Sequence, residues 1–156
     1  MSHKIIDELP SKYELNCTSA KKKPWGFTLG IRPESVGQFV NLFFSDSDLK
    51  SQQVSPRFLV INPNSRLSWQ WHRKRNELWR VVQGPVGVIL SNNDSQSSLE
   101  VKNNGFLIEI GPEVRHRLVG LETIAIVAEV WVHTNSNNPS DRDDIIRVED
   151  DYNRQK

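Results

Sequence analysis

Short runs of β-branched and aromatic residues, separated by polar turns, form the pattern of hydrophobic and polar positions along most of the chain. The runs are bounded by Gly, Pro, Asn, Asp and Ser, which favour turns. No helical periodicity is sustained long enough for a helical bundle. Many short strands with regular turn signals predict an all-β sandwich or barrel. The predicted strands are residues 38–44, 57–62, 66–71, 77–82, 87–90, 98–101, 106–110, 116–118 and 123–133.

The same pattern predicts an arm, one domain and a tail. Residues 1–22 mix charged and small polar residues, which predicts an N-terminal arm or a short helix followed by a linker. Residues 23–154 are predicted to form a single domain with its core at about 55–134, because a chain of 156 residues can bury a core of its own. The polar segment 134–144 predicts a loop that leads to a last short strand or a crossing of the barrel mouth. Trp25, between Pro and Gly, is expected to pack over one end of the barrel.

The charge and cysteine content exclude several classes of protein. The chain has 20 basic and 19 acidic residues, so neither a nucleic-acid surface nor an acidic solvating chain is expected. Cys17 is the only cysteine, which excludes an intrachain disulfide and a structural zinc site built on thiolates. The N-terminus lacks an apolar signal core, and no run approaches the roughly 18 apolar residues of a membrane span. We therefore expect a soluble cytoplasmic protein.

Four side chains along the chain are candidate metal ligands. Gln70 and His72 are two residues apart, so on a strand they point to the same face. Glu77 opens the next strand after a short polar break, and a hairpin would bring it to the same place. His116 lies where a strand restarts after a Gly-Pro turn. An amide oxygen, two imidazoles and a carboxylate are competent ligands for a divalent metal.

These residues also carry a resemblance to a known family. The pattern Gln-x-His-x4-Glu-x6-Gly, followed by a lone His, resembles the two metal-binding motifs of cupins. More narrowly, a series of motifs in the same order is similar to the type II mannose-6-phosphate isomerase domain, which is often fused behind a mannose-1-phosphate guanylyltransferase. The resemblance covers about Lys23 to Arg154. Its motifs are Lys23-Pro-Trp-Gly26, Leu67-Ser-x-Gln70-x-His72, Arg75-x-Glu77-x-Trp79, Val114-x-His116-Arg-Leu118 and Asp143-Asp-Ile-x-Arg147-x-x-Asp150-Asp-Tyr152.

The resemblance implies a fold and a cofactor. Cupins are jelly rolls, or double-stranded β-helices, and often pair into dimers; an unpaired edge strand at 38–44 would favour a homodimer. The implied cofactor is a divalent metal, with zinc expected and iron, manganese, cobalt or nickel compatible with the same donors. An iron oxygenase triad would use the same His72, Glu77 and His116, but a fourth protein ligand disfavours dioxygen chemistry.

The implied activity is the metal-dependent isomerisation of mannose 6-phosphate to fructose 6-phosphate through a cis-enediol. By resemblance, Arg147 lies at the mouth of the site and holds the enediolate or the phosphate; the alternative is a salt bridge with a neighbouring acid. Lys74, in the predicted hairpin, would reach a phosphate or lie in a solvated turn. Glu129 is expected to face the barrel interior as a general acid/base or as a structural hydrogen-bonding group. His133 is expected to be a surface or rim residue.

The sequence departs from the family pattern around the predicted substrate rim. Arg73, Lys74 and Leu78 occupy positions where the family usually has histidine, and Asn153 replaces a glycine. Two alternatives therefore stay open, namely an isomerase of another sugar phosphate such as a heptose phosphate, and a non-catalytic module that binds a sugar phosphate or nucleotide sugar. The guanylyltransferase activity of fused relatives is not expected, because the chain shows no Gly-rich phosphate loop.

Overall fold

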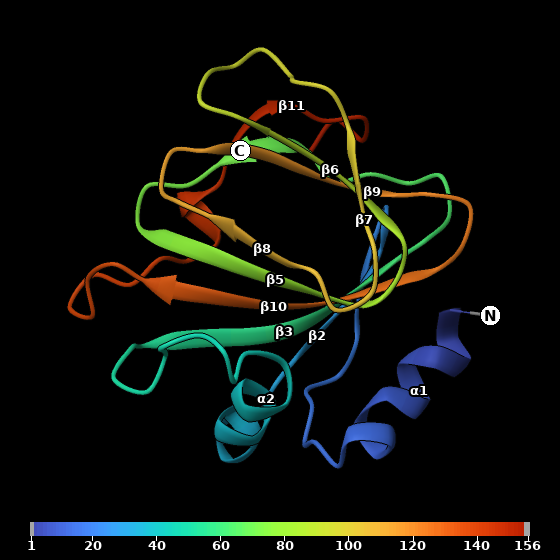
Figure 1. Cartoon of the computed structure of the whole chain (residues 1–156), viewed down its shortest axis with the longest axis vertical. Coiled ribbons are helices and arrows are strands. Elements are labelled where there is room, and N and C mark those ends of the chain that lie inside the picture. Colours follow the sequence, from blue (N-terminus) through green and yellow to red (C-terminus); the bar gives the residue numbers. More distant parts are fainter. Residues whose placement is uncertain (1, 155–156) are drawn as a thin grey trace.

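Two antiparallel sheets face each other in a computed structural model that describes residues 2–154 (Figure 1). This architecture confirms the predicted all-β jelly roll. The six-stranded sheet has the order β1 (Lys21–Lys23), β2 (Gly26–Gly30), β3 (Val54–Ile61), β10 (Ala125–His133), β5 (Arg75–Gln83) and β8 (Leu107–Ile110). The five-stranded sheet has the order β11 (Ile146–Glu149), β4 (Trp69–Trp71), β9 (Arg115–Gly120), β6 (Val86–Ser91) and β7 (Glu100–Lys102).

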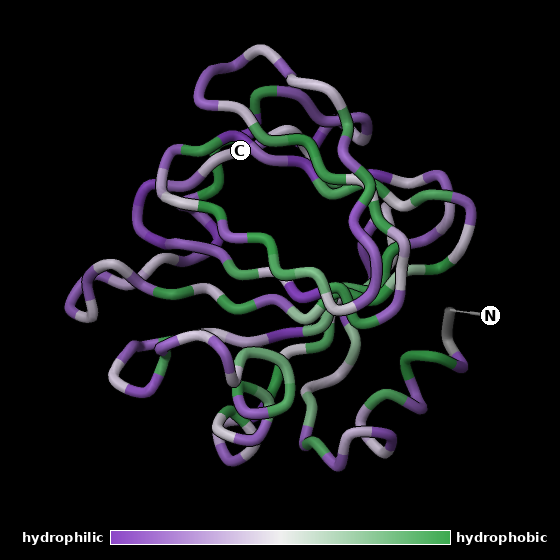
Figure 2. Tube along the Cα trace, viewed as in Figure 1, coloured by the Kyte–Doolittle hydropathy of each residue, from purple (hydrophilic) through white to green (hydrophobic). Residues whose placement is uncertain are grey.

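The central strand β10 separates two hydrophobic clusters because successive side chains point to opposite faces of a sheet. Ala125 and Val127 face the space between the sheets, where they pack with residues of β3, β5, β6, β8 and β9. Ile126, Ala128 and Val130 face the outer side of the six-stranded sheet. In Figure 2 hydrophobic and hydrophilic residues mix along the strands, while the connecting loops are largely hydrophilic. All nine residues of β10 are buried as a result.

Two helices cover the outer face of the six-stranded sheet. Helix α1 (Ser2–Tyr13) packs Ile6 and Leu9 into the outer cluster. Helix α2 (Val36–Phe43) follows a 3-10 turn, η1 (Pro33–Ser35), and lies with α1 on the side of β2 and β3 (Figure 1). A second 3-10 turn, η2 (Arg142–Asp144), precedes β11. Ile6 and Leu9 of α1 thus belong to the core.

The strand predicted at 38–44 is wrong, because this segment belongs to α2. Val36, Phe39, Val40 and Phe43 are partly or fully buried while the residues between them are exposed, which is helical spacing. Phe39 packs edge-on against Phe58 of β3, with ring centroids 5.1 Å apart. The segment offers no unpaired strand edge, so the reason given for a homodimer fails, and dimerisation stays a prediction.

Trp25 is buried, as expected from its position between Pro24 and Gly26. It belongs to the apolar cluster between the sheets, together with residues such as Leu59 and Ile61 of β3. Its backbone carbonyl accepts a hydrogen bond from the amide of Asn62 at the end of β3. Within residues 2–154, no helix combines the length and the apolar character needed to cross a bilayer.

The packing of α1 predicts a specific stability effect. Leu9→Ala should lower the free energy of unfolding by about 2–5 kcal/mol, because the side chain is almost fully buried in the outer cluster. Equilibrium unfolding in urea measures the change. Glu8→Ala is the matched control, since Glu8 is exposed and its ion pair with Lys4 is a surface contact. Equal stabilities of the two variants would contradict the assignment of α1 to the core.

Candidate metal centre

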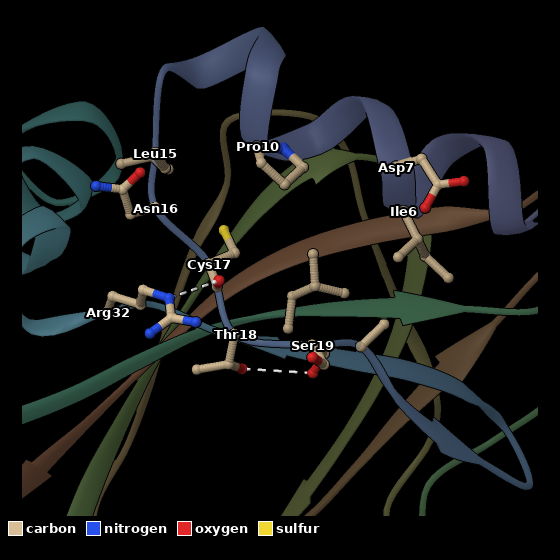
Figure 3. Close-up of a pocket in the computed structure, with 11 residues that line it drawn as sticks. Ile6, Asp7, Pro10, Leu15, Asn16, Cys17, Thr18, Ser19 and Arg32 are labelled. Carbon is tan, nitrogen blue, oxygen red and sulfur yellow. Dashed lines mark hydrogen bonds between the residues drawn. The ribbon is translucent and has the colours of Figure 1, made fainter.

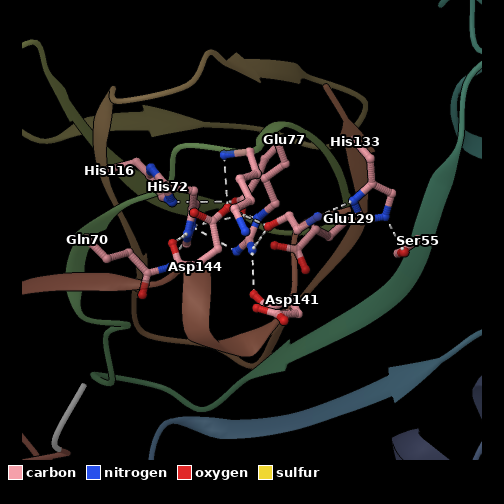
Figure 4. A network of polar contacts seen from close by, with 12 residues as sticks. Ser55, Gln70, His72, Glu77, His116, Glu129, His133, Asp141 and Asp144 are labelled. Atoms are coloured by element: carbon pink, nitrogen blue, oxygen red, sulfur yellow. Dashed lines mark hydrogen bonds and ion pairs between the residues drawn. The ribbon is translucent and has the colours of Figure 1, made fainter. Parts of the chain in front are cut away.

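The interior of the barrel changes from apolar to polar along its strands. On β10, the interior face continues from Ala125 and Val127 to Glu129, Trp131 and His133. The register places Glu129 opposite Trp79 of β5 and Arg57 of β3, and Trp131 opposite Glu77 and Ser55. Figure 4 shows the polar groups that gather at this end. The buried polar residues here are Gln70, His72, Arg75, Glu77, His116, Glu129, His133, Ser140 and Asp144.

His72, Glu77 and His116 form a compact set of potential metal ligands. One ligand atom from each lies within 4.8 Å of the others. Nε2 of His72 is 3.0 Å from Oε1 of Glu77, and Nε2 of His116 is 3.5 Å from Oε2. All three side chains are at most 2% exposed. The structure therefore brings together three of the four predicted ligands as a group that could hold a metal ion.

Backbone carbonyls orient both imidazoles. The carbonyl of Asp144 lies 3.2 Å from Nδ1 of His72, and that of Val114 lies 2.9 Å from Nδ1 of His116. Because a carbonyl only accepts hydrogen bonds, each Nδ1 carries a proton, and Nε2 of each ring is the nitrogen that faces Glu77. This arrangement is the one that metal-ligating histidines use.

Two of the potential ligand atoms are buried without a hydrogen-bond partner among the described residues. They are Nε2 of His116 and Oε2 of Glu77. Burial lowers the pKa of His116 to about 4, so its imidazole is neutral near pH 7. Burial opposes the negative charge of Glu77, but the positive charge of Arg75 outweighs it and holds the pKa of Glu77 well below the usual range. A neutral imidazole and an ionised carboxylate fit a divalent cation.

Gln70, the fourth predicted ligand, lies beside this group. It faces His116 directly in the pairing of β4 with β9, so the two side chains project to the same side. Its Nε2 lies 3.4 Å from Nε2 of His72, while its Oε1 accepts a hydrogen bond from the Ser68 hydroxyl. For Oε1 to bind a metal, the amide has to turn over. Its role as a ligand stays a prediction.

Arg75 contacts the candidate ligands directly, a position to which reasoning from the sequence gave no role. Its guanidinium donates from Nε to Oε1 of Glu77 at 2.8 Å and from Nη2 to Nε2 of His72 at 2.9 Å. Its Nη1 donates to the hydroxyl of Ser140 at 2.9 Å. The signal for it was present, because Arg75 and Glu77 have the same two-residue spacing that paired Gln70 with His72.

Glu129 faces the interior, as expected. Its Oε1 accepts a hydrogen bond from the indole of Trp79 at 3.1 Å, and its Oε2 lies 3.1 Å from Nε of Arg57. Burial raises the pKa of Glu129, the charge of Glu77 adds to that effect, and Arg57 opposes it. The barrel interior thus holds a second carboxyl group with a pKa shifted in the direction opposite to that of Glu77.

The prediction of a surface or rim position for His133 is wrong, because the residue is buried. Its Nδ1 accepts a hydrogen bond from the Ser140 amide at 3.0 Å, so Nε2 carries the proton and donates to the Ser55 hydroxyl 2.8 Å away. His133 cannot take a proton from Ser55 in this state. His133 is the last residue of β10, which suggested a position at the rim of the barrel. The following segment, residues 134–144, folds back over it and buries it.

The two predicted cationic residues lie in different surroundings. Arg147 of β11 faces Gln70 in register, so its side chain projects to the interior side of the sheet. Burial and the charge of Arg154 lower the pKa of Arg147. Glu149, one predicted salt-bridge partner, is bound instead by Arg66 and Arg117. Lys74 donates to the Asn138 side chain at 3.1 Å in an exposed contact, and the structure does not bring it into the cluster.

Of the positions that depart from the family, Leu78 does not line the site. Its side chain packs in the outer hydrophobic cluster, away from the interior face of β5. Arg73 is exposed and its guanidinium lies 5.0 Å from the ring centre of Trp71. The difference at Leu78 therefore leaves the ligand cluster unchanged. Arg73 and Lys74 lie in the connection from β4 to β5, and the predicted hairpin is wrong here, because the two strands belong to different sheets.

A hollow of about 410 Å³ lies outside the barrel, between α1 and the segment that leads to β2 (Figure 3). Its lining includes Ile6, Pro10, Leu29 and Cys17. Burial raises the pKa of the Cys17 thiol, which disfavours the reactive thiolate. Among the described residues, the side chains suited to metal binding therefore lie in the barrel interior and not in this hollow.

Comparisons with known proteins agree with this fold. A family described as mannose-6-phosphate isomerase C-terminal matches residues 46–150. Similar solved structures include CapF, a capsular polysaccharide assembling protein from Staphylococcus aureus, with 14% identity and a TM-score of 0.59 over 86% of this chain and 34% of CapF. Oxalate decarboxylase from Bacillus subtilis has 14% identity and a TM-score of 0.62 over 84% of this chain and 30% of the enzyme.

The structural likenesses show the cupin fold alone, at this level of identity. The chain spans about a third of the length of CapF and of oxalate decarboxylase. A search of curated proteins gave no match.

The burial of His116 predicts how stability depends on pH. Its pKa of about 4 lies below the ordinary 6.5, so between these values the unfolded chain binds more protons than the folded one. In metal-free protein, the free energy of unfolding should fall as the pH is lowered from about 6.5 to 4, by up to about 3 kcal/mol from this group. Urea unfolding across this range measures it. His116→Gln should have a shallower dependence, and an unchanged slope would contradict the assignment.

Proposed function

Because the chain belongs to the mannose-6-phosphate isomerase C-terminal family, we propose that it is a metal-dependent sugar-phosphate isomerase, with mannose 6-phosphate and fructose 6-phosphate as the substrate pair. One observation carries the proposal. Within the matched segment, Nε2 of His116 and Oε2 of Glu77 are buried without hydrogen-bond partners, beside a second imidazole that points the same way. Such a group of donors is suited to a divalent cation.

His72, Glu77 and His116 would hold the metal, and Gln70 would complete the set after its amide turns over. Zinc is the expected ion, and iron, manganese, cobalt or nickel fit the same nitrogen and oxygen donors. When bound, a divalent ion would supply Lewis-acid stabilisation of the negative charge that develops on a sugar oxygen. The carbonyls of Asp144 and Val114 would keep both imidazoles aimed at that ion.

Isomerisation also needs a group that moves a proton from C2 to C1 through the cis-enediol. Glu129 is the candidate, because it is a buried carboxyl whose pKa is raised toward the neutral range by burial and by Glu77. Its ion pair with Arg57 and its hydrogen bond from Trp79 fix the direction of the carboxyl group. The same contacts are those of a structural carboxylate, so a Glu129→Gln variant has to be judged by turnover rather than by folding.

The phosphate of the substrate would be bound by Arg147 at the mouth of the barrel. The position of Arg147 opposite Gln70 supports this role, because the register directs both side chains to the interior side. Lys74 could contribute only after leaving Asn138. A heptose phosphate is the alternative substrate, and a non-catalytic sugar-phosphate binding module is the alternative function, since Arg73 and Lys74 differ from the family pattern.

Proton exchange tests the proposed reaction directly. We would incubate zinc-loaded protein in heavy water with mannose 6-phosphate, and then with other aldose and heptose phosphates, and follow the C2 proton by NMR. Solvent deuterium in the sugar together with ketose formation, both lost on chelation, is the expected result. Bound metal without exchange for any of these sugars would overturn the isomerase and favour the binding module.

Removal of one ligand tests the metal site. His116→Ala should weaken zinc binding by more than about 100-fold and abolish turnover, because its Nε2 is a candidate ligand atom with no hydrogen-bond partner among the described residues. Zinc affinity is measured by competition with a chromophoric chelator. His133→Ala is the matched control, since this second buried histidine of the interior has both nitrogens engaged by Ser55 and Ser140. Similar zinc affinities for the two variants would contradict the assigned ligand set.

A further inference from the structure

The guanidinium of Arg75 already contacts the atoms that a metal would use. Its Nε and Nη2 form a fork that bridges Oε1 of Glu77 and Nε2 of His72, which are 3.0 Å apart. The side chain is only 2% exposed. We propose that Arg75 is a resident cation of the ligand cluster: it holds His72 and Glu77 together in the metal-free protein, and a metal ion has to displace it from His72 in order to bind. The inference rests on the metal site proposed above.

Arg75 and a metal ion would compete for the same lone pair of His72. The carbonyl of Asp144 can only accept a hydrogen bond, so Nδ1 of His72 carries the proton. Nη2 of Arg75 can only donate, so Nε2 of His72 receives this contact with its one lone pair. A metal ion needs the same lone pair, so the contact from Nη2 of Arg75 and a bond from His72 to a metal exclude each other. Oε1 of Glu77 has further lone pairs and can keep its contact with Nε of Arg75.

Charge repulsion also favours displacement of Arg75 by a metal ion. The positive charge of Arg75 is buried and is paired with Glu77. A divalent cation between His72 and Glu77 would share that carboxylate with the guanidinium, and two like charges in a dry interior repel each other strongly. Arginine does not lose its proton in proteins, so the repulsion has to be relieved by movement of the side chain.

The surroundings of Arg75 limit that movement to a local one. Nη1 donates to the Ser140 hydroxyl and, at 3.4 Å, to the carbonyl of Asp141. The guanidinium carbon lies 3.5 Å from the ring centre of Trp131. These contacts do not involve His72, so they can anchor the group while Nη2 withdraws. Ser140 also donates to Asp144, whose carbonyl orients His72, so the anchor and the imidazole are held by the same segment (Figure 4).

The test compares two arginines that lie over the same tryptophan ring. Arg57 also lies over the Trp131 ring, at 3.6 Å, and also pairs with a buried carboxylate, but that carboxylate is Glu129 rather than a proposed ligand. We would measure the zinc affinity of wild type, Arg75→Ala and Arg57→Ala by chelator competition, and their thermal unfolding with and without EDTA. Arg75→Ala should bind zinc about tenfold more tightly than wild type and be less stable in EDTA. Arg57→Ala should keep the wild-type zinc affinity.

A second measurement on the wild-type protein does not depend on how the variants fold. In metal-free protein the Arg75 guanidinium should give slowly rotating, protected side-chain signals in a ¹H–¹⁵N NMR spectrum, and zinc should abolish the protection of Nη2. Zinc binding with unchanged Arg75 signals, or an Arg75→Ala variant with wild-type or weaker zinc affinity, would overturn this inference while the proposed metal site stands. If neither wild type nor Arg75→Ala binds zinc, cobalt, nickel, manganese or iron, both proposals fail.

Discussion

The buried negative charge of Glu77 is the constraint on which the rest of the site depends. A carboxylate at 2% exposure must be paired, and Arg75, His72 and His116 surround it. The two imidazoles are in turn held by backbone carbonyls of Asp144 and Val114. The Asp144 side chain also accepts hydrogen bonds from the amides of Arg73 and Lys74, which follow His72 directly. Asp144, far along the chain, is therefore part of the site.

The buried charge of Glu77 is accommodated because apolar and polar side chains occupy opposite ends of the barrel interior. One end is filled by Trp25 and the aliphatic residues around it, which exclude water without polar contacts. The other end holds the carboxylates, each paired with an arginine, Glu77 with Arg75 and Glu129 with Arg57. The same strands β3, β5 and β10 supply both ends, since only every second residue faces inward. The same three strands therefore supply both the apolar core and the buried carboxylates.

The two-residue periodicity of strands made much of the fold and of the candidate ligand set predictable from the sequence. Strand spacing placed Gln70 with His72 on one face, and the Gly-Pro turn placed His116 at the start of β9, where the structure has them. A short apolar run does not distinguish strand from helix, and α2 was missed for that reason. The burial of His133 and the contacts of Arg75 depend on segment 134–144 folding back over the barrel, which no local pattern encodes. Local rules therefore identified the candidate ligands but not the groups that contact them.

The most direct test of the account is the position of a metal in crystals of the zinc-loaded protein, located by anomalous diffraction at the zinc edge. The account predicts one peak in the barrel interior, about 2.0–2.3 Å from Nε2 of His72, Nε2 of His116 and a carboxylate oxygen of Glu77. The amide of Gln70 should then present Oε1 to the ion. A peak bound to other side chains, or an interior without metal in fully loaded crystals, would contradict it.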